Sequence, residues 1–175
     1  MGRSLEHYKI PNGNTLISFS GGRTSGYMLH QILEANQGLP DKAKVVFANT
    51  GREMPETLDF VQECADRWNV QITWLEYTRI NNRVNYKVVN HNNAARNGEP
   101  LEELFLSRSY LPNVVSRFCT AEAKVRTIKR YLVTELKWKK WFSCIGIRAD
   151  EARRIKTESK DRWTFWYPLY EDNIT

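Results

Sequence analysis

The sequence has 175 residues, a length that suits a single domain, residues 1–175, with a hydrophobic core of its own. Hydrophobic residues make up 41% of the chain and charged residues 26%, and no apolar run approaches the roughly 20 residues that cross a bilayer. Because residues 1–7 lack the apolar core of a secretory signal, we expect a cytoplasmic protein without membrane contact.

The chain carries an excess of basic side chains. Lys and Arg number 26 against 20 Asp and Glu, which gives a formal net charge of +6. Such an excess favours anionic ligands, either a nucleotide, a nucleic acid or both. A basic surface without any such ligand is an equal alternative at this stage.

The first half of the chain alternates between predicted strands and helices. The predicted strands are the apolar runs 15–19, 44–49 and 70–75, which turn residues separate. Apolar residues recur at helical spacing after Gly22 and again after Pro55. This alternation predicts a doubly wound α/β fold, in which ligands bind beyond the carboxyl ends of the strands.

The second half is less regular. Residues from about 78 to 116 interrupt the alternation with polar stretches at 81–83 and 90–93 and a short helical piece at 101–106. Such a segment indicates an inserted substrate loop or, alternatively, a surface insertion. A helix is predicted over 121–136, with Val125 and Leu132 facing inward, followed by a strand over 141–147. With an edge strand at 163–169, the prediction is a mainly parallel five-stranded sheet with helices on both faces.

A glycine-rich turn follows the first predicted strand. It runs Ser18-Phe19-Ser20-Gly21-Gly22-Arg23-Thr24-Ser25. Two glycines let the backbone turn sharply, and the following helix then directs its unpaired N–H groups and positive dipole end at an anion. A turn that merely caps the helix is the alternative. The turn is neither the G-x-x-x-x-G-K-[ST] loop nor the G-x-G-x-x-G loop.

This turn resembles the PP-loop, S-G-G-x-D-S, of the adenine nucleotide alpha-hydrolase-like superfamily, which includes ATP pyrophosphatases and phosphoadenosine phosphosulfate (PAPS) reductases. Residues 47–57 resemble the N-T-G-x-x-x-P-E-T segment of the reductases, and Arg117-Phe118-Cys119-Thr120 with Lys124 is similar to their R-x-C-T…K element. Residues 146–154 look like their G-x-R-x-x-E-S-x-x-R element. Together these segments lie within residues 16–170, nearly the whole chain.

The resemblance implies roles for particular residues. Nucleotide contacts fall on Ser18, Ser20, Gly21, Gly22, Arg23, Thr24, Ser25, Asn49, Thr50, Gly51, Glu53, Arg117, Lys124, Gly146 and Arg148. By their own chemistry, Cys119, a nucleophile or sulfur carrier, Arg148 and Glu151 are the expected catalytic residues, and Asp150 is the expected metal ligand. For both acids, Mg²⁺ binding, action as a general base and ion pairs to the arginines remain alternatives. Cys64 and Cys144 are expected in the core.

The chain departs from the family pattern at two places. Thr24 stands where the PP-loop has Asp, and the cysteine-containing tail with which PAPS reductases attack the sulfonate is missing. We therefore expect a member that is truncated relative to its relatives, of phage or mobile-element origin, without an iron–sulfur cluster in this chain.

Three hypotheses follow. The first is a PP-loop enzyme that cleaves ATP, with Mg²⁺, to AMP and pyrophosphate and so adenylates a substrate, a transferase that could serve sulfur metabolism with a nucleic acid as acceptor. The second is an oxidoreductase related to the PAPS reductases, with PAPS in the same site. The third is a non-catalytic protein that binds nucleotide or nucleic acid. A homodimer remains open for all three.

Overall fold

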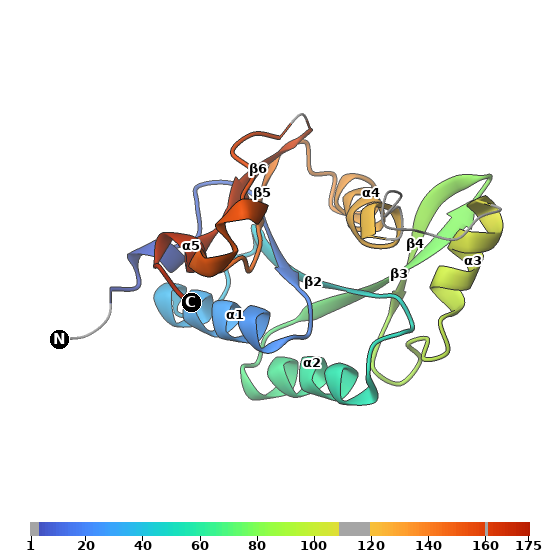
Figure 1. Cartoon of the computed structure of the whole chain (residues 1–175), viewed down its shortest axis with the longest axis horizontal. Coiled ribbons are helices and arrows are strands. Elements are labelled where there is room, and N and C mark those ends of the chain that lie inside the picture. Colours follow the sequence, from blue (N-terminus) through green and yellow to red (C-terminus); the bar gives the residue numbers. More distant parts are fainter. Residues whose placement is uncertain (1–3, 109–119, 160) are drawn as a thin grey trace. The chain divides into compact units, whose positions relative to one another are not determined.

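A computed structural model describes residues 4–108, 120–159 and 161–175 (Figure 1). It is an α/β fold with a mostly parallel six-stranded sheet, in the order β4-β3-β2-β1-β5-β6, flanked by helices. The strands are β1 (Thr15–Phe19), β2 (Ala43–Asn49), β3 (Ile72–Ile80), β4 (Arg83–Val89), β5 (Trp141–Cys144) and β6 (Trp163–Trp166). The helices are η1 (Glu6–Tyr8), α1 (Arg23–Asn36), α2 (Pro55–Arg67), α3 (Glu99–Arg108), η2 (Thr120–Arg126), α4 (Thr127–Thr134), η3 (Ala149–Arg154) and α5 (Pro168–Glu171). The predicted doubly wound α/β class is confirmed.

The chain divides into two compact units. The first comprises Met1–Val45, Glu63–Ile72 and Lys139–Thr175, and the second comprises Val46–Gln62 and Thr73–Trp138. Among the described residues, no helix combines the length and the apolar character that crossing a bilayer requires.

The core of the first unit forms around β1 and α1. Ile17 and Phe19 are buried on β1, as their apolar and β-branched run predicts. α1 buries Met28, Leu29 and Ile32 at helical spacing, and the Sγ of Cys144 on β5 lies 3.6 Å from the Met28 sulfur. β5 pairs parallel with β1 on one side and with β6 on the other. The carboxyl ends of these three strands therefore share one edge of the sheet.

The second unit contains a strand that the sequence analysis missed. β4 pairs antiparallel with β3, and the turn between them is Asn81-Asn82, both with positive φ (51° and 58°). Two such residues form the mirror-image turn that joins hairpin strands, and asparagine tolerates this conformation. No residue of β4 is buried, and the strand lacks the apolar run that marked the other strands. The sheet therefore has six strands rather than the predicted five.

The predicted helix over 121–136 is also different in detail. Its first part, η2, is a π-helix, and the ordinary α-helix begins only at Thr127. The Thr127 hydroxyl donates to the carbonyl of Glu122, five residues back, at 2.9 Å. The wider turn shifts the buried face by one residue or more, since Glu122 and Ala123 are buried whereas Val125 is 45% exposed. The prediction that Val125 faces inward is wrong for this reason.

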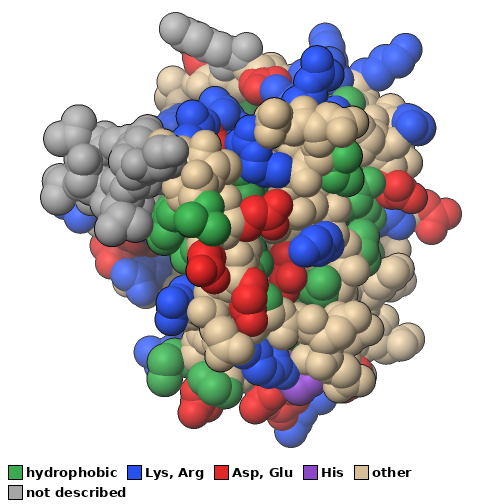
Figure 2. All heavy atoms as spheres, turned by 90° about the vertical axis from the view of Figure 1, so that its right-hand side faces the viewer, with side chains coloured by type: hydrophobic (Ala, Val, Ile, Leu, Met, Phe, Trp, Pro, Cys, Tyr) green, Lys and Arg blue, Asp and Glu red, His purple; other side chains and the backbone are tan. Residues whose placement is uncertain are grey.

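Figure 2 shows one face of the molecule in space-filling form. Basic and acidic side chains are interspersed on this face, and acidic side chains gather near its middle. The net charge of +6 is therefore not a uniform basic field here.

Candidate functional site

The glycine-rich turn of the first unit joins β1 to α1. Gly21 has a φ of 75°, a conformation that favours glycine, and Gly22 is the N-cap of α1 without a capping side chain. The first hydrogen bond within the helix is donated by the N–H of Gly26 to the carbonyl of Gly22, at 2.9 Å. The N–H groups of Arg23 and Thr24 therefore precede the helical hydrogen-bond ladder and point out of its positive end.

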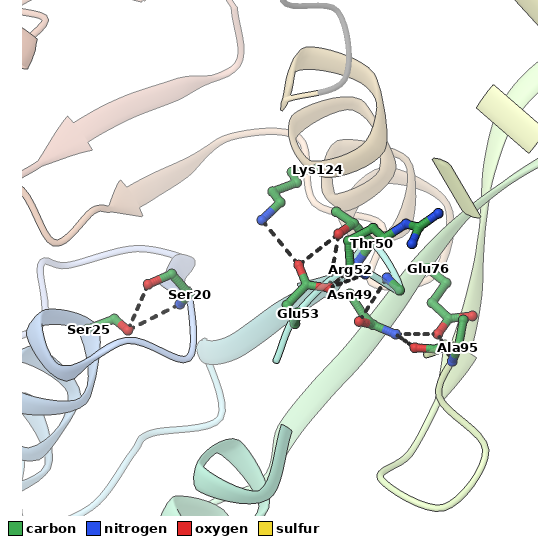
Figure 3. Close-up of polar contacts among 10 residues, drawn as sticks. Ser20, Ser25, Asn49, Thr50, Arg52, Glu53, Glu76, Ala95 and Lys124 are labelled. Atoms are coloured by element: carbon green, nitrogen blue, oxygen red, sulfur yellow. Dashed lines mark hydrogen bonds and ion pairs between the residues drawn. The ribbon is translucent and has the colours of Figure 1, made fainter. Parts of the chain in front are cut away.

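The side chain of Ser25 holds this turn in shape. Its buried hydroxyl donates to the carbonyl of Gly22 at 2.9 Å. It also accepts from the N–H of Ser20 at 3.2 Å (Figure 3). The hydroxyls of Ser20 and Ser25 lie 3.0 Å apart. Ser20 and Gly22 are exposed, whereas Ser18 is half-buried within β1. Ser25 thus acts as an internal brace, and the exposed part of the turn remains accessible to an anion.

Arg148, Asp150 and Glu151 follow the carboxyl end of β5, at the same edge of the first unit's sheet as the turn. The Arg148 guanidinium donates to both carboxylate oxygens of Asp150, at 3.0 and 2.9 Å. Glu151 accepts from the Arg148 N–H at 3.4 Å and pairs with the Arg154 guanidinium. These hydrogen bonds, from Arg154 first and then Arg148, hold the pKa of the Glu151 carboxyl below its ordinary value.

These pairs bear on the expected roles of the two acids. The fork of Arg148 engages both oxygens of Asp150, as the ion-pair alternative for this acid expects, and the role of Asp150 as Mg²⁺ ligand stays a prediction. A lowered pKa makes the Glu151 carboxylate a weaker base. Gly146 is half-buried, and a Cβ there would meet the Met28 sulfur at 3.6 Å, an ordinary contact.

The Asn49-Thr50-Gly51 turn of the second unit follows β2 and is tied to neighbouring backbone. The fully buried Asn49 amide donates to the Glu76 carboxylate at 2.7 Å and to the carbonyl of Ala95 at 2.9 Å, and its oxygen accepts from the N–H of Gly51 (Figure 3). Glu76 also accepts from the N–H of Ala95. Asn49 is therefore satisfied within the chain and positions the turn.

Glu53 organises the rest of this turn. Its carboxylate accepts from the N–H and the hydroxyl of Thr50, each at 2.9 Å, and from the N–H of Arg52 at 3.2 Å. The ammonium of Lys124, from the π-helix η2, lies 3.6 Å from the same carboxylate, and the Lys124 side chain is 41% exposed (Figure 3). The second unit thus presents a cation beside a threonine whose hydroxyl and N–H are held by Glu53.

The match to known families extends over most of the chain. The family model described as phosphoadenosine phosphosulfate reductase domain covers residues 14–165. The chain belongs to the PAPS reductase family. A curated relative is the uncharacterized nin region protein ORF290 of Escherichia phage lambda, 31% identical over 154 residues. That match covers 85% of this chain and 52% of the relative, so the chain spans about half the relative's length.

The description of this family names an adenine nucleotide, phosphoadenosine phosphosulfate. Both expected loops, the turn at residues 18–25 and the turn at residues 49–53, lie within the matched residues. The similarity to a phage protein is consistent with the expected phage member.

For a PAPS reductase-like chain, the thiols are of particular interest. Cys64 and Cys144 are buried, and burial raises the pKa of the Cys64 thiol to about 11 and that of Cys144 well above its ordinary value. Both are core residues, as predicted. Arg117 and Cys119 lie outside the described residues, so their expected roles stay predictions.

The sequence analysis missed two buried carboxylates. Glu76 lies within the buried run of β3, and its charge among apolar neighbours was a signal that it has partners. Glu122 is buried in η2 and pairs with the guanidinium groups of Arg108 and Arg126. Across the described ranges, no group of three or more His, Cys, Asp or Glu side chains could hold a metal ion.

Proposed function

We propose that the chain binds an adenine nucleotide with its phosphates at the glycine-rich turn, and cleaves ATP between the α- and β-phosphates. The observation that carries this proposal is the Ser25-braced turn at the positive end of the 14-residue helix α1. Membership of the PAPS reductase family is the reason for proposing an adenine nucleotide.

The geometry supports a reaction in which pyrophosphate is the leaving group. An oxygen of the acceptor attacks the α-phosphorus, the bond to the bridging oxygen breaks, and pyrophosphate departs with that electron pair. The N–H groups of Arg23 and Thr24, together with the helix dipole, stabilise the negative charge that grows on pyrophosphate. Because these donors are fixed by Ser25 before the nucleotide arrives, they need no reorganisation during the step.

Arg148 is a further donor at this edge of the first unit. Asp150 holds its guanidinium from one side through two hydrogen bonds, which limits its rotation. A fixed guanidinium that is 38% exposed suits contact with a phosphate or sulfate oxygen. Mg²⁺ is expected to arrive on the nucleotide phosphates, because Asp150 is engaged by Arg148.

The second unit carries other residues that the sequence analysis expects to bind nucleotide, on a turn of its own. Lys124 supplies an ammonium suited to a phosphate oxygen. The Thr50 hydroxyl donates its hydrogen to Glu53, so it is suited to accept from a ribose hydroxyl. We include them, with Gly51, among the nucleotide-binding residues. Asn49 is included as the residue that positions this turn.

A reductase reaction on PAPS is the second candidate, favoured by the family description. It needs a thiolate to attack the sulfonate, and the two described cysteines are buried with raised pKa values. Cys119 is therefore the thiol on which this candidate depends.

Calorimetric titration of ATP and of PAPS, each with Mg²⁺, tests the proposal. The variant Gly22→Asp places a carboxylate at the turn, whereas Gly22→Ala adds only a Cβ, 3.6 Å from the Ser20 hydroxyl. Gln31→Glu, farther along α1, is the charge-matched control. We expect the aspartate variant to lose nucleotide binding and the other two to retain it.

The bound ATP samples are then assayed for AMP and pyrophosphate. Pyrophosphate release that Gly22→Asp abolishes supports ATP cleavage. Tight binding of PAPS without ATP cleavage transfers the function to the second candidate. If neither nucleotide binds, the turn is only a helix cap and the proposal is wrong.

A further inference from the structure

A cavity of about 390 Å³ opens at the amino ends of β1, β5 and β6 in the first unit. This volume lies within the range of roughly 300–1,000 Å³ that small-molecule sites occupy. The glycine-rich turn follows the opposite end of β1, a strand whose five residues span about 16 Å. The cavity is therefore a different place from the proposed phosphate site.

Two tryptophans in register form the wall of this cavity. Trp141 on β5 and Trp163 on β6 are paired across the parallel strands, and their rings stack with centroids 5.6 Å apart and planes at 28°. Trp141 is only 4% exposed, whereas Trp163 is half-buried. The buried indole thus supports the more exposed one from below.

A second pair of rings repeats this arrangement along the chain. Phe165, two residues after Trp163, stacks on the buried Tyr167 with centroids 5.7 Å apart and planes at 17°. Trp163 and Phe165 meet edge to face at 6.4 Å. Because side chains two residues apart on a strand lie on one face, about 6.6 Å apart along it, β6 displays two half-buried rings in a row.

Cations accompany the rings at the cavity. Lys140 directly precedes Trp141 and Arg162 directly precedes Trp163, and both are exposed. The register of the strands brings the two cations to the same end. The acidic residue of the lining, Asp161, accepts a hydrogen bond from the Arg162 N–H at 2.8 Å.

Amide side chains complete the set. Asn12 and Asn14 line the cavity from the segment before β1. An amide donates and accepts at once, which suits the edge of a nucleobase. Rings in series beside exposed cations, with amides at the cavity wall, are the features that single-stranded nucleic acid sites use.

We propose that Trp163 and Phe165, with Lys140 and Arg162, form a binding platform for single-stranded nucleic acid, here named the β6 platform. One base enters the cavity and stacks against Trp163, and the next stacks on Phe165. The two cations contact the phosphates between them. β6 is an edge strand, so the rings lie where a chain can run past them. Bases paired in a duplex are stacked on each other and do not reach such rings.

Fluorescence anisotropy tests the platform. A labelled single-stranded oligonucleotide of about 16 nucleotides is titrated with the full chain at low salt. Trp163→Ala, Phe165→Ala and Arg162→Glu should each weaken binding by about tenfold, whereas Trp163→Phe should stay close to the unmodified chain because it keeps a ring. Lys9→Glu changes an exposed cation of the same unit that does not line the cavity, and it should leave binding unchanged.

The salt dependence of binding and the comparison with duplex and mononucleotides identify the class of ligand. Arg162→Gln should reduce the slope of log affinity against log salt by about one. Circular dichroism checks the fold of each variant. If Trp163→Ala does not fold, the binding affinities of Arg162→Glu and Phe165→Ala test the proposal instead. The proposal is wrong if the oligonucleotide does not bind at protein concentrations up to about 100 μM, or if duplex binds equally well. It is also wrong if only mononucleotides bind, or if all these variants retain binding.

Discussion

The amide of Asn49 donates to the carboxylate of Glu76 at 2.7 Å, and both side chains are buried. The same amide bonds to the carbonyl of Ala95, and the same carboxylate oxygen accepts the N–H of Ala95. Two side chains thus fix the segment around Ala95 and, through the Gly51 N–H, the turn after β2. The contact is a structural element of the second unit that also shapes a proposed ligand-binding turn.

Removing the Asn49 amide should destabilise the protein. Asn49→Ala leaves the buried Glu76 carboxylate without one donor and opens a small cavity, which we expect to lower the free energy of unfolding by about 2–4 kcal/mol. Urea denaturation measures the loss. Asn92→Ala, at an exposed position, is the matched control and should change stability by less than about 0.5 kcal/mol. Equal free energies of unfolding for the two variants would show that the Asn49–Glu76 contact does not stabilise the fold.

Gly51 should tolerate no side chain. Its φ is 76°, and a Cβ there would lie 2.9 Å from the backbone nitrogen of Gly98. Gly51→Ala therefore combines backbone strain with a clash against another backbone segment. Gly38→Ala is the control, since Gly38 also has a positive φ but nothing within 4 Å of its Cβ position. We expect the control to lower the melting temperature modestly and Gly51→Ala to lower it clearly more, and similar melting temperatures would contradict the clash.

The sequence predicted the parts of this fold that rest on apolar periodicity. β1 and β2 have buried apolar runs and α1 buries apolar residues at helical spacing, so their side chains alone indicate their structure. β4 depends instead on the Asn81-Asn82 turn and on pairing with β3, and its exposed residues show no such run. A hairpin turn of two asparagines was the signal available for it.

The geometry of the candidate site could be predicted from the sequence only in part. The glycine-rich turn could be predicted because its glycines and hydroxyl residues are consecutive in the sequence, between a predicted strand and a predicted helix. The brace formed by Ser25 and the ties of Asn49 to Glu76 and Ala95 could not, since they join atoms whose proximity only the folded backbone decides. The π-helix η2 has a wider turn than the 3.6-residue period that the sequence analysis assumed. It therefore buries Glu122 and exposes Val125, which that period did not predict.

Lys124 should affect nucleotide affinity far more than stability. Its pair with Glu53 is partly exposed, and such pairs contribute about 0–1 kcal/mol to folding. Lys124→Ala should therefore leave the urea midpoint nearly unchanged and weaken ATP binding by about tenfold if the ammonium contacts a phosphate. Lys87→Ala, an exposed lysine of β4 in the same unit, should change neither quantity. Unaltered ATP affinity in Lys124→Ala would remove this residue from the proposed site.

The carboxyl of Glu151 should titrate below the ordinary glutamate range. Hydrogen bonds from Arg154 and from the Arg148 N–H lower its pKa, so the folded state binds this proton less readily than the unfolded state. The stabilisation is present above the unfolded pKa and is lost as the pH falls through the folded pKa. Carbon-detected NMR of the carboxyl measures the value. Arg154→Ala should move it up toward the ordinary value, and an unchanged titration in this variant would contradict the assigned cause.

The buried thiols offer a test that separates the two candidate reactions. Burial raises the pKa of Cys64 to about 11 and that of Cys144 well above its ordinary value, so both remain protonated thiols near pH 8. Brief treatment of the folded chain with iodoacetamide should leave both unlabelled by peptide mass spectrometry, whereas the chain in denaturant should react at both. Cys64→Ser should accordingly spare any PAPS-dependent activity in proportion to the folded protein present, and Cys119→Ser should abolish it. Rapid labelling of Cys64 or Cys144 in the folded chain would show that these thiols are open to reaction, and would return them to the candidates for the reductase nucleophile.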